Sequence, residues 1–507
     1  MLKKLRRALA VLFWAGITLL LLDFSGALNH WLGWMAKVQF LPAVMALNLA
    51  VIALLVLLTL VFGRVYCSVI CPLGVYQDGV SGFRGLLSKK ARRRFHYRKE
   101  HKWLRYGIWA LFVIAIIAGV HAFVVILAPY SAYGRIIQSI FQPVVVWGNN
   151  LLAAWSERAG NYAFYPKEAW LRSLPVLITA AVTLVVVTIL AWKGGRTYCN
   201  DICPVGTTLS FFSRFSIFRP VIDADKCKNC HICEHECKAS CIDISTHTID
   251  HTRCVDCFNC ISACKFDALH YQNRFLHAAS GLGLNDKEEA EKSPSTGRRA
   301  FLVGAAAAVG TATLKAAAKK TDGGFAEILP KQAPEREIPL TPPGSKSVKD
   351  FYTRCTACQL CVAECPNDVL RASGSLEHFL QPEMSYEKGY CRPECTRCSE
   401  LCPSGAITRI TREEKTDYHI GLATVDRTMC ITENPAEQVG VSVDCGLCAR
   451  HCPVGAILMV PVDPDDPEGR KHPVVMEDLC IGCGACENLC PVRPVSAIRV
   501  NGRQNHK

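Results

Sequence analysis

The chain has 507 residues, 29 of them cysteines; half of its residues are hydrophobic, and its formal net charge is +13. At roughly 150 residues per domain, this length allows several domains. The positive charge does not favour nucleic-acid binding, because ten Lys and Arg residues gather in residues 84–105, between hydrophobic stretches, as in the cytoplasmic loops of membrane proteins. The cysteines do not favour a disulfide scaffold, because most of them recur at gaps of two or three residues, which is typical of metal thiolates.

Four hydrophobic stretches predict membrane-spanning helices. They are residues 8–28, 41–62, 106–128 and 174–192. Each is long enough to cross a hydrocarbon core about 30 Å thick at 1.5 Å per residue. Lys and Arg residues near the N-terminus and in residues 84–105 place both segments in the cytoplasm, so the second and fourth spans end there. Residues 135–155 are fairly apolar with polar interruptions, and we expect them to form a helix on the outer surface.

A twelve-residue repeat follows the second and fourth spans. Gly63-Arg-Val-Tyr-Cys67-Ser-Val-Ile-Cys71-Pro-Leu-Gly74 matches Gly195-Arg-Thr-Tyr-Cys199-Asn-Asp-Ile-Cys203-Pro-Val-Gly206 at eight of twelve positions. The repeat predicts two helix hairpins in parallel, each presenting a Cys-x3-Cys-Pro motif at the cytoplasmic surface. Its cysteines could pack as small apolar residues. We favour a redox or metal site formed by Cys67, Cys71, Cys199 and Cys203, because duplicated thiols beside a proline are costly to keep reduced without a use.

The next cysteines suggest two different cofactors. Cys227-Lys-Asn-Cys230-His231 fits the attachment motif of c-type haem, but it leaves the following cysteines unexplained. Two iron–sulfur motifs explain all of them: Cys227, Cys230, Cys233 and Cys237, then Cys254, Cys257, Cys260 and Cys264. In such pairs the fourth cysteine serves the other cluster. We therefore expect Cys264 to join the first three cysteines and Cys237 to join Cys254, Cys257 and Cys260, with His231 an ordinary loop residue.

Four further quartets occupy the second half of the chain. They are Cys355, Cys358, Cys361, Cys365; Cys391, Cys395, Cys398, Cys402; Cys430, Cys445, Cys448, Cys452; and Cys480, Cys483, Cys486, Cys490. Each ends in Cys-Pro, whereas Cys237 and Cys264 precede Lys. Zinc also binds Cys-x2-Cys pairs, but three cysteines at two-residue gaps with a fourth before proline favour [4Fe–4S] clusters. The sequence thus predicts six clusters and leaves open both the pairing in this half and the role of Cys241.

A polar linker and a possible export signal separate the two groups of clusters. Gly297-Arg298-Arg299-Ala300-Phe301-Leu302 and the Ala/Gly-rich run to Ala318 fit the twin-arginine pattern. An exposed helix or a fifth span would also fit. We expect four regions: a membrane domain in residues 1–220, a two-cluster domain in 221–275, a linker with the signal or anchor (297–318) and a Pro-rich tether in 276–350, and a four-cluster domain in 351–507.

These motifs resemble two known families. Residues 1 to about 275 resemble the NapH-type membrane ferredoxins, which combine four spans, two Cys-x3-Cys-Pro motifs and two cytoplasmic [4Fe–4S] clusters. Residues 297–507 resemble the NapG/MauM-type ferredoxins, which carry a twin-arginine signal and four clusters. The chain looks like a fusion of the two. The resemblance implies an α-helical membrane domain plus α+β bacterial-ferredoxin-like domains with six [4Fe–4S] motifs.

The resemblance also implies a function. In those families the two proteins act together as a quinol dehydrogenase that feeds periplasmic reductases. We therefore expect an electron-transfer component, without a catalytic residue of its own, that takes electrons from the quinol pool and passes them to a terminal reductase or carrier protein. The alternative is a factor that supplies electrons for the assembly or maintenance of another enzyme's metal centre. We expect the bacterial inner membrane, with the N-terminus cytoplasmic and the C-terminal domain periplasmic; the acceptor, the direction of electron flow and the oligomeric state stay open.

Overall fold

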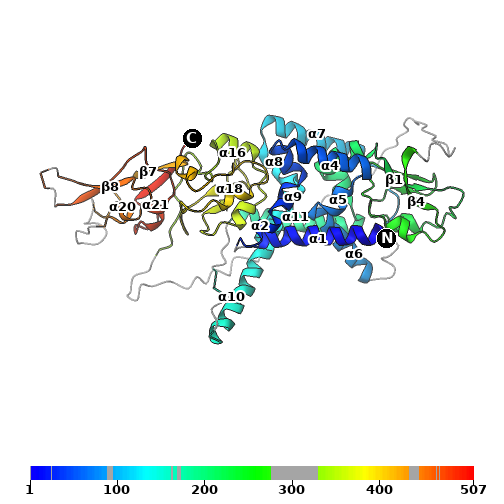
Figure 1. The fold of residues 1–507 in the computed structure, drawn as a ribbon, viewed down its shortest axis with the longest axis horizontal. Helices are drawn as coiled ribbons and strands as arrows, with labels where there is room; N and C mark the ends of the chain where they lie inside the picture. Colours follow the sequence, from blue (N-terminus) through cyan, green and yellow to red (C-terminus); the bar gives the residue numbers. More distant parts are fainter. Residues whose placement is uncertain are drawn as a thin grey trace, which may run out of the picture.

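The computed structural model describes residues 2–23, 26–87, 95–160, 164–167, 173–275, 329–432, 445–463, 465–466 and 469–506. The twin-arginine-like segment 297–318 lies outside them, so its expected role is not addressed by the structure. Figure 1 shows three bodies in a row: a helical body in the middle, a first cysteine-rich unit (residues 218–275) at one end and a second cysteine-rich unit (residues 329–506) at the other.

The helical body contains two successive sets of helices. The first set comprises α1 (Leu2–Leu22), α2 (Asn29–Lys37), α3 (Phe40–Met45), α4 (Leu49–Phe62), α5 (Val65–Val69) and α6 (Pro72–Leu87). The second comprises α7 (Lys102–Ala118), α8 (His121–Leu127), α9 (Pro129–Ile136), the π-helical turn η2 (Ile137–Phe141), α10 (Gln142–Arg158), α11 (Leu174–Gly194), the π-helical turn η3 (Tyr198–Ile202) and α12 (Pro204–Ser213). In each set a long first helix is followed by two short ones, and an apolar helix (α4 or α11) leads into the cysteine repeat; in the second set η2 and α10 come between the short helices and α11.

The expected spans differ in length from the observed helices. Among the described residues, α1 and α11 are each long and apolar enough to cross a membrane, and α8 with the helix after it forms a bent pair, at 74°, that could be a third span. The stretch 41–62 is interrupted because Leu47 has a φ of 52° and Asn48 caps α4, accepting the N–H of Val51 at 3.3 Å. The stretch 106–128 is interrupted at Gly119, whose left-handed φ of 75° ends α7. Four spans therefore stay a prediction.

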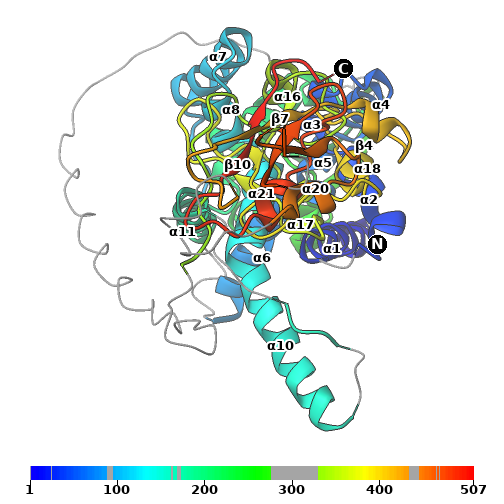
Figure 2. The same ribbon diagram turned by 90° about the vertical axis from the view of Figure 1, so that its left-hand side faces the viewer.

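Large apolar side chains are exposed on the outer faces of the helical body. They include Leu54 on α4, Ile117 on α7 and Val182 on α11, which are 56%, 80% and 58% exposed. On a soluble protein, exposed apolar surface of this extent would favour aggregation, whereas in a membrane lipid would cover it. Helix α10, in the region expected to lie on the outer surface, projects away from the body, as Figure 2 shows.

The two cysteine-rich units are built from small antiparallel sheets and short helices. The first contains β1 (Phe218–Ile222), α13 (Ile232–Glu236), β2 (Ile242–Asp243), β3 (Thr248–Ile249), α14 (Asn259–Ala263) and β4 (Leu269–Asn273). The second contains α16 (Val348–Arg354), α17 (Leu360–Ala363), β5 (Leu370–Ala372), β6 (Pro382–Met384), α18 (Arg397–Leu401), the 3-10 turn η4 (Glu414–Asp417), β7 (Gly421–Val425), α20 (Leu447–Arg450), β8 (Ile457–Pro461), β9 (Lys471–Val475), α21 (Ala485–Leu489) and β10 (Ile498–Gly502). Strands β1 and β4 pair with Ile222 opposite Leu269, and β7 and β10 pair with Val425 opposite Ile498, so each pair closes a segment that carries two cysteine motifs.

The length of helix α1 gives the distance between the two units. Near its start, Lys3 Nζ donates a hydrogen bond to Ser262 Oγ at 2.8 Å, in the first unit. Just beyond its end, Gly26 lies against the side chain of Arg397, in the second unit. About 20 helical residues at 1.5 Å each separate these contacts by about 30 Å. The two units therefore lie at opposite ends of the helical body.

Candidate functional site

In the first unit, cysteines from both motifs surround one cavity. Cys237, Cys254, Cys257 and Cys260 line it together with Cys241 and apolar side chains such as Ile242 and Ile261. This brings together the set expected from cross-pairing. Cys233 interacts electrostatically with Cys227 and Cys230, and Cys264 packs against the same buried core. His231 bonds Glu234 through Nδ1 at 2.6 Å and sits in the loop between ligands, as expected of a loop residue.

The second unit shows the pairing that the sequence leaves open. Cys365 lines a cavity with Cys391, Cys395 and Cys398. Cys490 lines another with Cys430, Cys445 and Cys448. Cys402 interacts electrostatically with Cys355, Cys358 and Cys361, and Cys452 interacts with Cys483, next to Cys480 and Cys486. Each group thus takes three cysteines from one motif and the fourth from its neighbour.

These groups suit a multi-atom cofactor. No three His, Cys, Asp or Glu side chains in the described residues are arranged to hold a single metal ion. Three of the cysteine groups instead surround apolar cavities. Four thiolates around an apolar cavity form the ligand set of a [4Fe–4S] cubane. The donor set therefore fits an iron–sulfur cluster.

The four groups of the second unit follow one another in space. The group of Cys361 interacts with the next group through Cys398. The Cys391 N–H then donates to the Cys483 carbonyl at 2.9 Å, which joins the second and third groups. Cys486 of the third group interacts with Cys448 of the fourth. The first group in this series touches the helical body, because a Cβ on Gly134 of α9 would lie 2.2 Å from the Cys358 carbonyl oxygen. Only glycine permits this approach.

The repeated motifs of the helical body are held together by two crossed arginines. Arg64 Nη2 donates to the Cys199 carbonyl at 3.2 Å, and Arg196 Nη1 donates to the Cys67 carbonyl at 2.6 Å. Each arginine therefore binds the opposite repeat. Glycines make room for them. A Cβ on Gly74 would lie 2.6 Å from Arg196 Nη1, and one on Gly206 would lie 2.7 Å from Arg64 Nη2.

A buried carboxylate anchors this region to the first unit. Asp78 on α6 pairs with Arg6 at 2.8 Å, with Arg196 at 2.9 Å and with Lys238 at 3.3 Å. The Lys238 carbonyl also accepts the Arg196 backbone N–H at 2.8 Å. Lys238 is the residue that replaces the usual proline after Cys237. The structure thus explains this departure as a docking contact, whereas it offers no explanation for Lys265 after Cys264.

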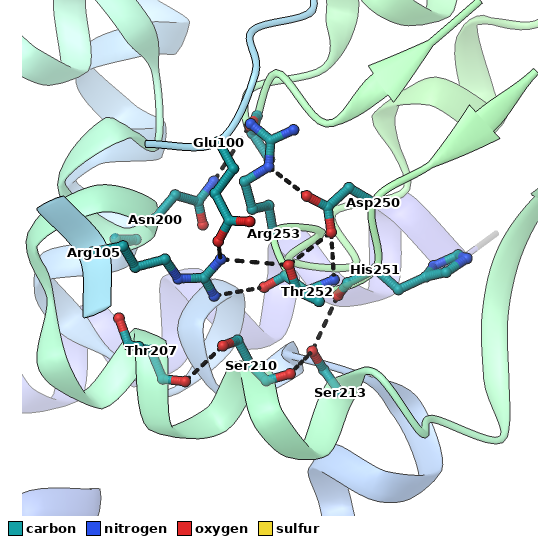
Figure 3. Close-up of polar contacts among 12 residues, drawn as sticks. Glu100, Arg105, Asn200, Thr207, Ser210, Ser213, Asp250, His251, Thr252 and Arg253 are labelled. Carbon is teal, nitrogen blue, oxygen red and sulfur yellow. Dashed lines mark hydrogen bonds and ion pairs between the residues drawn. The ribbon is translucent and has the colours of Figure 1, made fainter. Parts of the chain in front are cut away.

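A polar turn at residues 250–252 of the first unit also contacts the helical body, as Figure 3 shows. The Thr252 carbonyl accepts two hydrogen bonds, one from Nη2 of Arg105 at 3.1 Å and one from Nη1 of Arg64 at 2.9 Å. Ser213 Oγ of α12 donates to the His251 carbonyl at 3.0 Å. Asp250 holds the turn by accepting the Thr252 N–H at 3.0 Å. Because this turn leads directly into Cys254, the helical body positions the ligands of the nearer cysteine group.

Cys241 lies among the ligands of that group. Its Sγ is 3.5 Å from Cys237 Sγ, and its side chain is buried. A hydrogen bond from the Cys241 thiol lowers the pKa of Cys237 to about 7, and the same bond raises the pKa of Cys241 well above its usual value. Cys241 is the fourth residue after Cys237. In the second motif of this unit the fourth residue after Cys264 is Ala268.

Replacing Cys241 by Ala is expected to leave every cluster in place, because alanine already occupies the corresponding position in the second motif. Replacing Cys237 by Ser should damage the cluster held by Cys254, Cys257 and Cys260, with a loss of up to about four irons per chain. Iron analysis and EPR of the anaerobically purified full-length variants would measure both effects. A lost cluster in C241A together with an intact set in C237S would reverse the assignment of the two residues.

Sequence reasoning singled out the cysteines of the repeat but missed the residues that hold them. The signal was present, because the arginine pair Arg64 and Arg196 and the glycine pair Gly74 and Gly206 are among the eight matching positions. No sequence signal indicated the part played by Asp78, whose cationic partners lie 72 or more residues away.

Comparisons with known proteins agree on iron–sulfur chemistry. A family model described as a 4Fe-4S binding domain matches residues 44–94 and 173–221, which contain the two Cys-x3-Cys-Pro motifs. A model described as a 4Fe-4S dicluster domain matches residues 443–493. No solved structure shows a significant match.

Three curated relatives illustrate the similarity. The methylamine utilization ferredoxin-type protein MauM of Methylobacillus flagellatus is 28% identical over 145 residues, 27% of this chain and 58% of that protein. The MauM of Paracoccus denitrificans is 31% identical over 191 residues, 36% of this chain and 78% of that protein. The ferredoxin-type protein NapF of Escherichia coli K12 is 30% identical over 141 residues, 23% of this chain and 82% of that protein. The chain thus spans little more than half of the first relative.

Proposed function

The chain belongs to the family of ferredoxin-type iron–sulfur proteins that includes MauM and NapF, and we propose that it carries electrons across a membrane, from quinol to a separate protein acceptor. In this proposal the six cysteine groups of the two units hold six [4Fe–4S] clusters. The helical body acts as the NapH-type membrane part, and the second unit delivers the electrons on the periplasmic side.

One observation carries the proposal. The two cysteine-rich units lie at opposite ends of a helical body, and α1 contacts the first near Lys3 and reaches the second beyond Leu22. The distance of about 30 Å that α1 covers equals the thickness of a hydrocarbon core. This arrangement supports redox centres on both faces of a membrane, with apolar helix surfaces between them.

The order of the groups in the second unit supports a route of transfer. The first group lies against α9, and the others follow it away from the helical body. The last group, with Cys430 and Cys448, lines a cavity with the apolar residues Val425 and Pro473. Electrons that enter beside α9 would leave at this far end, where a reductase or a carrier protein could dock.

Quinol is expected to reduce the clusters of the intact protein, because the proposal makes it the electron donor. Potentiometric EPR of membranes that contain the full-length chain, recorded with and without added quinol, would measure the reduction. Dithionite serves as the control that shows how many clusters can be reduced. Clusters that dithionite reduces but quinol does not would contradict quinol as the donor.

A further inference from the structure

We propose that Cys67, Cys71, Cys199 and Cys203 hold a seventh iron–sulfur cluster, which links the redox centres at the two ends of the helical body. This inference rests on the proposed function and supplies its missing step. Six clusters divided between two ends would leave a gap of about 30 Å along α1. The four cysteines lie inside the helical body that occupies this gap, Cys67 in α5, Cys199 in η3, and Cys71 and Cys203 directly before α6 and α12.

The four thiols form one group. Each side chain is no more than 5% exposed. Cys203 interacts electrostatically with Cys199, Cys71 and Cys67. The two repeats therefore bring together four cysteines, the number that ligates either a [2Fe–2S] or a [4Fe–4S] cluster. The family model described as a 4Fe-4S binding domain spans both pairs.

Every one of the four sulfurs faces a hydrogen-bond donor. The backbone N–H of Gly206 donates to Cys203 Sγ at 3.4 Å, and that of Gly74 makes the matching bond to Cys71. Both donors belong to the first turns of helices, α12 and α6, whose positive dipole ends favour an anionic sulfur. Because the pattern repeats in both halves, it is a property of the site rather than of one loop.

Side chains supply the donors for the other two sulfurs. Arg64 Nη2 points toward Cys67 Sγ at 3.9 Å, and Arg196 Nη1 points toward Cys199 Sγ at 3.7 Å. Gln77 Nε2 donates to Cys199 Sγ at 3.2 Å. N–H groups directed at sulfur stabilise the thiolate ligands of iron–sulfur clusters and adjust their potentials. Apolar packing of cysteines as small side chains would not require these donors.

The charges around the site also favour an anionic group. Arg64 is fully buried, yet the hydrogen-bond acceptors of its guanidinium are the side-chain oxygen of Asn200, the carbonyls of Thr252 and Cys199, and Cys67 sulfur. A buried cation whose hydrogen-bond partners are uncharged is costly. The buried carboxyl of Asp256 interacts with Arg64 electrostatically and through the Arg64 backbone N–H, and thiolates around a cluster would add negative charge beside the guanidinium itself.

The site lies on a path between the two units. On one side, Cys257 of the nearest group interacts with Lys238 and Asp78, and Asp78 binds Arg196. On the other side, the Tyr198 hydroxyl, next to Cys199, donates to the Leu127 carbonyl at 3.1 Å, where α8 ends. The next helix, α9, carries Gly134, which touches Cys358. Figure 1 shows α5, α9 and α18 in this order along the long axis.

The chemistry is a one-electron exchange. A reduced cluster in the first unit loses one electron, and the seventh cluster gains it. The seventh cluster is then oxidised by the group that contains Cys358. No covalent bond forms or breaks in this exchange between clusters. Under the proposed function each quinol that is oxidised to quinone releases two protons and supplies two electrons, which pass along the clusters one at a time.

Counting iron in the full-length protein tests the inference. Anaerobically purified protein should contain about 28 irons with a [4Fe–4S] centre or about 26 with a [2Fe–2S] centre, against about 24 for six cubanes alone. The double variant C67S/C199S should fall to about 24, with acid-labile sulfide falling in parallel, while D225N, at an exposed residue, stays at the wild-type value. Mössbauer spectra should lose one component only in the double variant.

A count of about 24 in both the wild type and the double variant would overturn the inference, as would two disulfides in their place. If the double variant does not accumulate, C203S in whole membranes provides the same comparison by Mössbauer spectroscopy. The result is independent of the proposed donor. A seventh cluster that quinol does not reduce would count against the proposed function alone, and quinol reduction of a protein with six clusters would count against the inference alone.

Discussion

Replacing Asp78 by Asn is expected to destabilise the full-length protein by about 3–5 kcal/mol, the usual cost of removing one partner from a buried ion pair. The Asp78 side chain is 10% exposed and contacts Arg6, Arg196 and Lys238. Asn would leave these cations without their carboxylate and would weaken the docking of the first cysteine-rich unit. Thermal unfolding of the detergent-solubilised protein would report the loss as a lower midpoint.

The pH dependence of this contribution has a definite sign. Burial alone would raise the pKa of Asp78, but Arg196, Lys238 and Arg6 hold it well below its usual value. Because the folded pKa lies below that of the unfolded chain, the stabilisation is complete above about pH 4 and is lost as the pH falls further. The exposed Asp225 provides the control, and D225N should change stability by less than about 0.5 kcal/mol. Equal midpoints for D78N and D225N would rule out the anchoring role.

External protease is expected to digest the chain after Ala318 in intact spheroplasts while sparing residues 227–264. The reason is the position of the two units at opposite ends of the helical body, combined with the cytoplasmic N-terminus that the basic residues near it predict. Immunoblots against each half of the chain would measure the digestion. Replacing Arg298 and Arg299 together by Lys should abolish it, because both belong to the expected export signal.

The control for this experiment is lysed spheroplasts, in which both halves of the chain should be cleaved. The C-terminal half could instead resist the protease completely in intact spheroplasts whose periplasmic face the protease is shown to reach. That result would place all clusters in the cytoplasm. That result would contradict the proposed periplasmic delivery of electrons. It would leave the iron content of the protein unchanged, so the cluster assignments would not depend on it.

Local patterns in the sequence predicted the cysteine groups because ligand spacing is a local property. The cross-pairing of Cys237 with Cys254 and its neighbours followed from the same rule. The sequence could not indicate where Arg64 and Asp78 point, because their partners lie far away in the chain and meet only after the helices pack. The breaks at Asn48 and Gly119 were predictable in principle, since asparagine caps helix starts and glycine ends helices, but the apolar runs around them suggested continuous spans.

The crossed arginines have a consequence for how such a protein can be assembled. Each arginine donates to a carbonyl of the opposite repeat, Arg64 to Cys199 and Arg196 to Cys67. A chain with only one repeat would lack this acceptor, so it would adopt the same arrangement only by pairing with a second copy of itself. The present chain is in effect a symmetric dimer joined by a linker. Joining the copies frees their sequences to diverge. Ser68 and Val69 in one repeat correspond to Asn200 and Asp201 in the other, and Asn200 Nδ2 donates a hydrogen bond to the Ala239 carbonyl of the first unit at 3.3 Å. Covalent fusion thus allows one half to specialise in holding the first unit while the shared centre keeps its symmetry.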